Sequence, residues 1–336
     1  MEFPQNGAVE SGAAVQASSG RVPIYELYGL RVRSELPLDA PVGAGGRFDI
    51  DVELMPSRAI SSGPDGNDAV VAAYGEPGGE GYSHVATEDG FTLRYFSICE
   101  FRVDRRLARV RATLDPGAAP GLAGLLFRGN AVALMLALRN EPVLHASAVE
   151  SGGAAVAFLG ASGSGKSTLA ALCCASGGRL VTDDLLRLEW GGDGLQCHPG
   201  HPELRLREGA AGLAERLCER PPEKSVDGRF LARCPARATG MTRLEAIVVA
   251  RPSRGHRELE VRRLRAAQAL FYLLGYPRVS GWRLDGALSG QFQEMARIAQ
   301  AIPVFEVVVP WGPPFPESLA REIFEAVGVE FQPEET

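Results

Sequence analysis

Residues 154–172 read AAVAFLGASGSGKSTLAAL, and this stretch decides the fold of the chain. Its centre, residues 160–167, matches the phosphate-binding pattern G-x-x-x-x-G-K-[ST] in full. Glycines let such a loop fold into a nest whose backbone N–H groups point at phosphate oxygens. The pattern therefore predicts a nucleotide-binding loop made of Gly160, Ser162, Gly163, Ser164, Gly165, Lys166, Ser167 and Thr168.

The residues on either side of this loop have the composition that the motif requires. Residues 154–159 are all apolar and predict a buried strand, and residues 168–172 open a helix whose N-terminus faces the phosphates. In this context Lys166 is expected to reach the β- and γ-phosphates, and Ser167 to place its hydroxyl on Mg²⁺. The predicted cofactors are therefore ATP and Mg²⁺.

Two adjacent carboxylates follow the loop. Residues 179–182 predict a short strand that ends at Asp183 and Asp184, 17 and 18 positions after Lys166. Adjacent residues on a strand point in opposite directions, so one carboxylate can face the metal while the other faces the phosphate acceptor. The alternative is a turn or a helix cap, where aspartate is common.

The order LHASAV, strand, GASGSGKST, helix and RLVTDD resembles the catalytic domain of the HPr kinase/phosphorylase family. It is most similar to the HPr-kinase-like proteins, which include kinases found with lasso-peptide biosynthesis. The resemblance is strong over residues 140–190 and holds only in outline beyond them. It implies a phosphate-binding-loop kinase domain that shares its nucleotide-binding fold with phosphoenolpyruvate carboxykinase. It also implies three roles: His145 as the family's histidine, Asp183 as the general base, and Asp184 as the metal-side carboxylate.

Two further candidates follow from the same resemblance. Glu203, in the segment Glu203-Leu204-Arg205, matches the first part of a family segment and is a candidate metal neighbour, with a solvated surface carboxylate as the alternative. Lys224 lies where related kinases have a basic residue near the nucleotide or substrate. In the family's enzymes that have both kinase and phosphorylase activity, a glycine-rich stretch follows this segment and is associated with the phosphorylase activity. That stretch is absent here, which argues against phosphorylase activity.

Composition narrows the class of protein. The 336 residues suggest two domains, and a 45% hydrophobic fraction supplies an ordinary core. The net charge of −6 gives no basic field for nucleic acid, and we expect no membrane-spanning segment. Six cysteines without a C-x-x-C pair favour a reducing, cytoplasmic setting and disfavour zinc.

The chain order predicts four parts. Residues 1–20 are expected to be disordered, and residues 21–115 to form a small, mainly antiparallel β domain. Residues 116–140 provide a linker and a buried apolar helix at 121–139, and residues 141–330 form the α/β catalytic domain. In the β domain we expect one strand over 22–32 and a hairpin turn at 88–90.

These observations predict an ATP- and Mg²⁺-dependent bacterial serine kinase. Its expected partners are a nucleotide and a peptide or small protein carrying the acceptor serine, by resemblance a lasso-type precursor peptide; a homo-oligomer is an option for assembly. The alternatives are an HPr(Ser) kinase, a small-molecule kinase, a non-kinase ATPase or nucleotide switch, and a binding protein without catalysis. Residues 288–291, LSGQ, resemble the ABC-transporter ATPase signature, but the strand at 304–309 ends in Pro310 and Trp311 instead of Asp-Glu.

Overall fold

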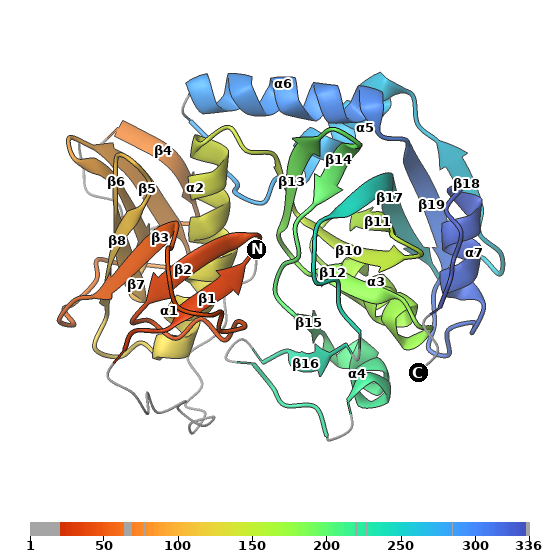
Figure 1. The fold of residues 1–336 in the computed structure, drawn as a ribbon, viewed down its shortest axis with the longest axis horizontal. Coiled ribbons are helices and arrows are strands. Elements are labelled where there is room, and N and C mark those ends of the chain that lie inside the picture. The colour runs from red at the N-terminus through yellow and green to blue at the C-terminus, as the bar shows by residue number, and fades with distance from the viewer. Residues whose placement is uncertain are drawn as a thin grey trace. The chain divides into compact units, whose positions relative to one another are not determined.

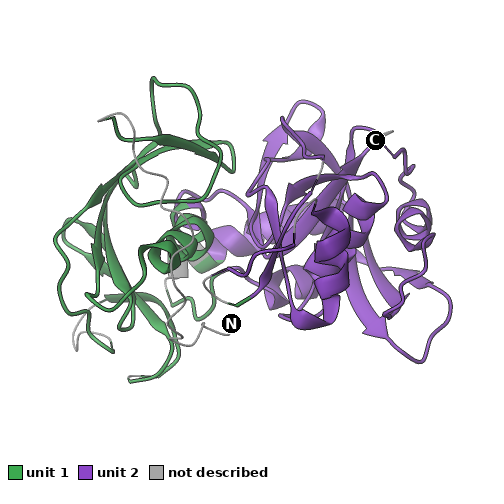
Figure 2. Ribbon diagram, turned by 90° about the horizontal axis from the view of Figure 1, so that it is seen from below, with its two compact units in different colours: residues 1–135, 226–228, 279–288 green, residues 136–225, 229–278, 289–336 purple. Residues whose placement is uncertain are grey.

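The structure is a computed structural model that describes residues 21–63, 69–76, 78–218, 221–225, 228–234, 236–283 and 285–333. The expected disorder of residues 1–20 lies outside these ranges. The chain divides into two compact units, coloured separately in Figure 2. Unit 1 comprises residues 1–135, 226–228 and 279–288, and unit 2 comprises residues 136–225, 229–278 and 289–336. The first division therefore falls at 135/136, within the predicted apolar helix, and segments 226–228 and 279–288 return to unit 1.

Unit 1 is built on a sheet of eight strands among the described residues, in the order β1-β2-β3-β8-β7-β6-β5-β4. Most neighbours are antiparallel, while β3 runs parallel to both β2 and β8. The strands are β1 (Ile24–Leu27), β2 (Leu30–Ser34), β3 (Ile50–Leu54), β4 (Ala69–Tyr74), β5 (Tyr82–Thr87), β6 (Gly90–Tyr95), β7 (Cys99–Asp104) and β8 (Arg109–Leu114).

Turns explain where the expectations for this sheet succeed and fail. The hairpin at 88–90 is confirmed, since β5 and β6 pair from Thr87 and Gly90 outward. The single strand over 22–32 is wrong, because Tyr28 and Gly29 adopt positive φ angles of 54° and 70° and turn the chain back on itself. Strands β1 and β2 form an antiparallel hairpin instead.

The apolar helix is present, in three pieces. Helix α1 (Pro120–Leu126) continues through a π-helical segment (Phe127–Ala131) into α2 (Val132–Leu138). By length and composition the 19-residue stretch Pro120–Leu138 could cross a membrane, with a mean hydropathy of 1.6, yet 83% of its most apolar window is buried inside the protein. It therefore has the burial of a core helix.

Unit 2 is built on a second large sheet, nine strands among the described residues, so the fold is mixed α/β. Strands β11, β17 and β19 run parallel and form its centre (Figure 1). The strands are β9 (Val143–Leu144), β10 (Ala146–Ser151), β11 (Ala154–Leu159), β12 (Arg179–Thr182), β13 (Leu186–Gly191), β14 (Gly194–Cys197), β17 (Thr242–Ser253), β18 (Glu260–Arg263) and β19 (Val304–Pro310). Strands β15 (Glu203–Leu206) and β16 (Phe230–Arg233) form a separate pair.

The alternation of side chains along β11 divides the core of unit 2 into two layers. Val156 and Phe158 belong to the cluster that contains α3, α4 and α7, while Ala155, Ala157 and Leu159 belong to the cluster that contains α5 and α6. The helices are α3 (Lys166–Ala175), α4 (Ala211–Leu217), α5 (Ala266–Gly275), α6 (Asp285–Ala301) and α7 (Leu319–Ala326), with a 3₁₀ turn at Glu208–Ala210.

Candidate active site

The strand order of unit 2 brings three separate segments to one edge of the sheet. Strand β10 lies between β11 and β12 and runs antiparallel to both, with Ala146 opposite Leu159 and Ala148 opposite Thr182. The beginning of β10 therefore meets the ends of β11 and β12. The first segment carries His145 and the last carries the two carboxylates, so the sheet itself gathers these residues beside the loop that follows β11.

The phosphate-binding loop has the backbone that its glycines permit. Gly160, Gly163 and Gly165 have φ angles of 155°, 81° and 87°, and Gly165 is the last residue before α3. A Cβ atom on Gly165 would lie 2.2 Å from the Trp311 ring, and one on Gly160 would lie 2.4 Å from Ser164 Oγ. Only glycine fits these two positions without moving a neighbour.

The side chain of Lys166 bonds to the backbone of the phosphate-binding loop. It is buried, and its Nζ donates to the carbonyl oxygens of Gly160 and Ala161, each at 3.0 Å. Burial lowers the pKa of this ammonium group, while the charges of Asp184 and Asp183 raise it. The cation is thus held at the loop by neutral carbonyls that a phosphate group can replace.

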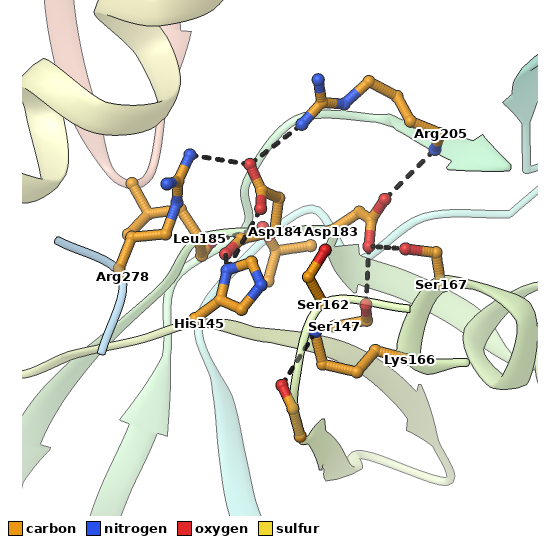
Figure 3. A network of polar contacts seen from close by, with 12 residues as sticks. His145, Ser147, Ser162, Lys166, Ser167, Asp183, Asp184, Leu185, Arg205 and Arg278 are labelled. Atoms are coloured by element: carbon orange, nitrogen blue, oxygen red, sulfur yellow. Dashed lines mark hydrogen bonds and ion pairs between the residues drawn. The ribbon is translucent and has the colours of Figure 1, made fainter. Parts of the chain in front are cut away.

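Asp183 is surrounded by uncharged hydrogen-bond donors. Its Oδ1 accepts from Ser147 Oγ at 2.6 Å and from Ser167 Oγ at 2.8 Å, and its Oδ2 accepts from the backbone N–H of Arg205 at 3.1 Å. Figure 3 shows this carboxylate turned toward the first turn of α3. The hydroxyl expected to face Mg²⁺ therefore contacts Asp183.

Asp184 is turned toward cations instead. Its Oδ2 accepts from Arg205 Nη2 at 2.9 Å and from Arg278 Nη2 at 2.8 Å, and its Oδ1 lies 3.2 Å from His145 Nδ1 (Figure 3). The same His145 nitrogen lies 3.1 Å from the Asp184 carbonyl oxygen. Asp184 has a positive φ of 75°, which a residue with a side chain rarely adopts.

These contacts shift the pKa values of Asp184 and His145. Burial raises the pKa of Asp184, but Arg278, His145 and Arg205 together hold it well below its ordinary value. Burial lowers the pKa of His145, an effect that the hydrogen bond and charge of Asp184 partly oppose. Asp184 is therefore a firmly ionised carboxylate enclosed by donors.

The two carboxylates point in different directions although both lie beyond the end of β12, and their neighbours differ from the sequence-based assignment. That assignment grouped Ser167 with Asp184 at the metal. The structure brings Ser167 to Asp183, because Asp183 directly follows β12 and faces α3. Asp184 lies beyond the end of the strand, in a turn that brings it to the arginines.

The other two candidates lie in different surroundings. Glu203 is buried on β15, where its Oε1 accepts from Arg233 Nε at 2.7 Å. Lys224 is 57% exposed, with its Nζ 3.8 Å from Glu208 Oε2 and 4.7 Å from the centre of the Phe230 ring. Neither Glu203 nor Lys224 therefore has Asp183 or Ser167 among the partners described here.

Four site residues were missed by the sequence reasoning. Ser147 lies on β10, two positions after His145. Because side chains two positions apart in an extended chain point the same way, this spacing was the signal that could have found it. Arg205 belongs to the segment Glu203-Leu204-Arg205, but no role was predicted for it. Arg207 follows two positions later, and its Nη2 lies 3.4 Å from Ser162 Oγ. Arg278 lies 94 residues from Asp184, and nothing local in the sequence marks it.

The residues of the loop fit the phosphates of a nucleotide. Besides the glycine positions that admit no side chain, Ser164 Oγ is buried and, within the described residues, has no hydrogen-bond partner. No group of three or more His, Cys, Asp or Glu residues that could hold a metal ion occurs in the described part of the chain. The hydroxyl of Ser167, in the first turn of α3, is the kind of protein oxygen that Mg²⁺ takes together with phosphates and water.

Comparison with known proteins gives limited similarity. No family model and no curated protein matches the sequence. Among solved structures, the HPr(Ser) kinase/phosphatase from Coxiella burnetii is similar at 14% identity and a TM-score of 0.30, over 54% of this chain and 95% of that chain. A similarity of this size does not by itself assign a fold family or an activity.

Proposed function

We propose that unit 2 is an ATP- and Mg²⁺-dependent phosphotransferase that moves the γ-phosphoryl group of ATP to a hydroxyl group. The observation that carries this proposal is the 2.8 Å hydrogen bond from Ser167 to Asp183 beside a complete phosphate-binding loop. Enzymes with this loop hold Mg²⁺ through the hydroxyl of the loop serine or threonine, and kinases place an aspartate nearby to accept the proton of the substrate hydroxyl. Ser167 and Asp183 lie side by side as that pair would.

The nucleotide phosphates are bound by the backbone of residues 160–167 and by Lys166. When bound, Mg²⁺ neutralises charge on the β- and γ-phosphates. Ser167, with Asp183 as its neighbour, would hold the ion. Arg207, beside Ser162, adds a positive charge at the rim of the loop.

Asp183 is the better general base of the two carboxylates. A general base must accept a proton, and a carboxylate whose pKa is held well below its ordinary value by two guanidinium groups accepts one poorly. Within the described residues, Asp183 accepts hydrogen bonds from two hydroxyls and a backbone N–H, all of them neutral. As the acceptor oxygen bonds to phosphorus and the bond to ADP breaks, Asp183 takes the hydroxyl proton. His145 and Asp184 hold the turn from which it projects.

The acceptor is proposed by resemblance to be a serine near the C-terminus of a ribosomally made, lasso-type precursor peptide. HPr protein and a small-molecule hydroxyl are the next candidates. The remaining alternative is an ATPase or a nucleotide switch, in which water and not a substrate hydroxyl accepts the phosphoryl group. The sequence resemblance at residues 140–190 favours the kinase over the ATPase.

The test is transfer of phosphate to a peptide. The protein is incubated with ATP, Mg²⁺ and a serine-containing precursor peptide, and mass spectrometry follows the peptide. A gain of one phosphate on serine, absent with Asp183→Asn, supports the proposal. ADP formation at the same rate with and without any peptide or small-molecule hydroxyl would instead identify an ATPase. Phosphate on HPr alone would keep the kinase and change the substrate.

A further inference from the structure

One segment of unit 2 concentrates positive charge on a chain whose net charge is −6. Residues 251–265, RPSRGHRELEVRRLR, carry six arginines against two glutamates. We call this segment the basic hairpin; it contains the end of β17, the connecting loop and β18. All six arginines are exposed: Arg251, Arg254, Arg257, Arg262, Arg263 and Arg265.

Some of these arginines already have a structural partner. Arg251 and Arg262 both pair with Glu306 on β19, and together with the Tyr272 hydroxyl they lower the pKa of that carboxyl to about 2. By contrast, Arg254, Arg257 and Arg263 make no ion pair within the described part of the chain. Three guanidinium groups of the basic hairpin are thus available to a partner.

The strand register places the basic hairpin at the edge of the sheet that carries the phosphate-binding loop. Strands β11, β17 and β19 are parallel, so their carboxyl ends lie at one edge, and Ser253 of β17 is opposite Pro310 of β19. Strand β18 is antiparallel to β19 with Glu260 opposite Val308, so the loop 254–259 begins and ends at that edge. Three strand spacings separate β18 from β11, a distance of about 14 Å.

Strand β18 also offers a free side. Its four residues are all exposed, and in the described residues it pairs only with β19. A sheet edge of this kind can accept an extended segment of another polypeptide, whose main chain continues the hydrogen-bond ladder. Arginines on the edge oppose the addition of basic or neutral strands and favour an acidic one.

We propose that the basic hairpin is the docking site for an extended acidic segment of the phosphate acceptor. The segment lies along β18, and its carboxylates pair with Arg254, Arg257 and Arg263. This inference rests on the proposed function for the identity of the partner, since docking there holds a hydroxyl-bearing residue one short stretch of chain from Gly160–Ser167. It adds to that function a charge preference in the substrate.

The composition of the basic hairpin favours a polypeptide over the other anionic partners. Residues 251–265 contain no Phe, Tyr or Trp, whereas surfaces that hold single-stranded nucleic acid stack bases on aromatic rings. The segment is a strand and a loop, not an amphipathic helix with the apolar face that inserts into a membrane surface. An edge strand is the feature that a peptide backbone recognises.

The experiment measures binding without nucleotide. A fluorescent twelve-residue peptide that alternates Glu with Ser is titrated with the full-length protein, and anisotropy is recorded at low and at physiological salt. A Gln-for-Glu peptide and a peptide with alternate N-methylated amides serve as ligand controls. The variant combines Arg254→Ser, Arg257→Ser and Arg263→Ser. The matched control, Arg106→Ser, Arg109→Ser and Arg216→Ser, removes the same charge from exposed positions elsewhere.

We expect the hairpin variant to bind the Glu peptide roughly tenfold more weakly, as the loss of three exposed ion pairs implies, with the control variant unchanged. Salt should weaken binding, and both control peptides should bind less well. Equal losses in the two variants, or equal binding of the N-methylated peptide, would overturn the proposal. Single-stranded RNA or phosphatidylserine vesicles that displace the peptide at a lower concentration of negative charge than unlabelled Glu peptide would also overturn the proposal. Because no ATP is present, this binding measurement does not depend on the proposed kinase activity. A failure of peptide binding and a failure of phosphate transfer can therefore be told apart.

Discussion

The hydroxyl of Ser167 donates a 2.8 Å hydrogen bond to Asp183 Oδ1, which joins the first turn of α3 to the end of β12. The two residues are 16 positions apart, and the segment between them contains the rest of α3 and the whole of β12. The same carboxylate oxygen accepts from Ser147 on β10. Three elements of unit 2 thus converge on a single oxygen atom.

Lys166→Ala should weaken ATP binding by a factor on the order of ten to a hundred, since a hydrogen bond to a charged group contributes about 1.5–3 kcal/mol. The ammonium group is already at the loop, bonded to two carbonyls that phosphate oxygens would replace. Isothermal titration with ATP and Mg²⁺ measures the change. Ser176→Ala, just past the other end of α3, is the control; unchanged affinity in Lys166→Ala would contradict the assigned loop.

Asp183→Asn should lower phosphate transfer by roughly 10²–10⁴-fold, because the amide keeps the shape of the side chain but cannot take the acceptor proton. Nucleotide affinity should change much less. Turnover and ATP affinity are measured on the same preparation. If ATP·Mg²⁺ affinity falls as steeply as turnover, Asp183 acts as a metal ligand first, and its role as a base is lost.

Asp184→Asn should destabilise unit 2 by an amount on the order of 2 kcal/mol, because two guanidinium groups would then face a neutral amide. Arg278 is the more buried of the two and, within the described residues, its Nε has no hydrogen-bond partner. Urea unfolding of Asp184→Asn, Arg278→Met and the double variant gives the coupling between them. Strictly additive losses would show that the ion pair does not hold the turn.

Unit 1 should lose stability in mild acid because of His84. Its ring is fully buried against Asn130 and Tyr82, and burial lowers its pKa to about 4 from 6.5. As the pH falls below 6.5 the unfolded chain binds a proton that the folded chain refuses, so stability present above pH 6.5 decreases down to pH 4. The full difference is about 3 kcal/mol.

Thermal unfolding between pH 7.5 and pH 4 tests this, with His84→Gln beside the unmodified protein. The glutamine variant should be less stable at pH 7.5 but show a shallower decline, since it has no proton to bind at this position. Parallel declines in the two proteins would place the acid sensitivity at another group.

Local patterns in the sequence determined the glycine-rich loop at 160–167 and most of the elements around it. A strand, a glycine loop and a helix at residues 154–175 are specified by residues that lie next to one another, as is the hairpin between β13 and β14 at 191–194. Such elements depend on backbone preferences and short-range hydrogen bonds. The single strand expected over 22–32 was wrong because the chain turns back at Tyr28 and Gly29, and a tyrosine rarely adopts the positive φ found at Tyr28.

Only the tertiary structure decided the partners of the two carboxylates. Nothing in the sequence indicates that β10 lies between β11 and β12, yet that order brings His145 and Ser147 to the Asp183–Asp184 turn. Arg278 reaches Asp184 across 94 residues. An aspartate at the end of a strand takes its role from the groups that packing places around it. Those groups come from distant parts of the chain, whose approach is set by the burial of the whole sheet and not by the residues next to the aspartate.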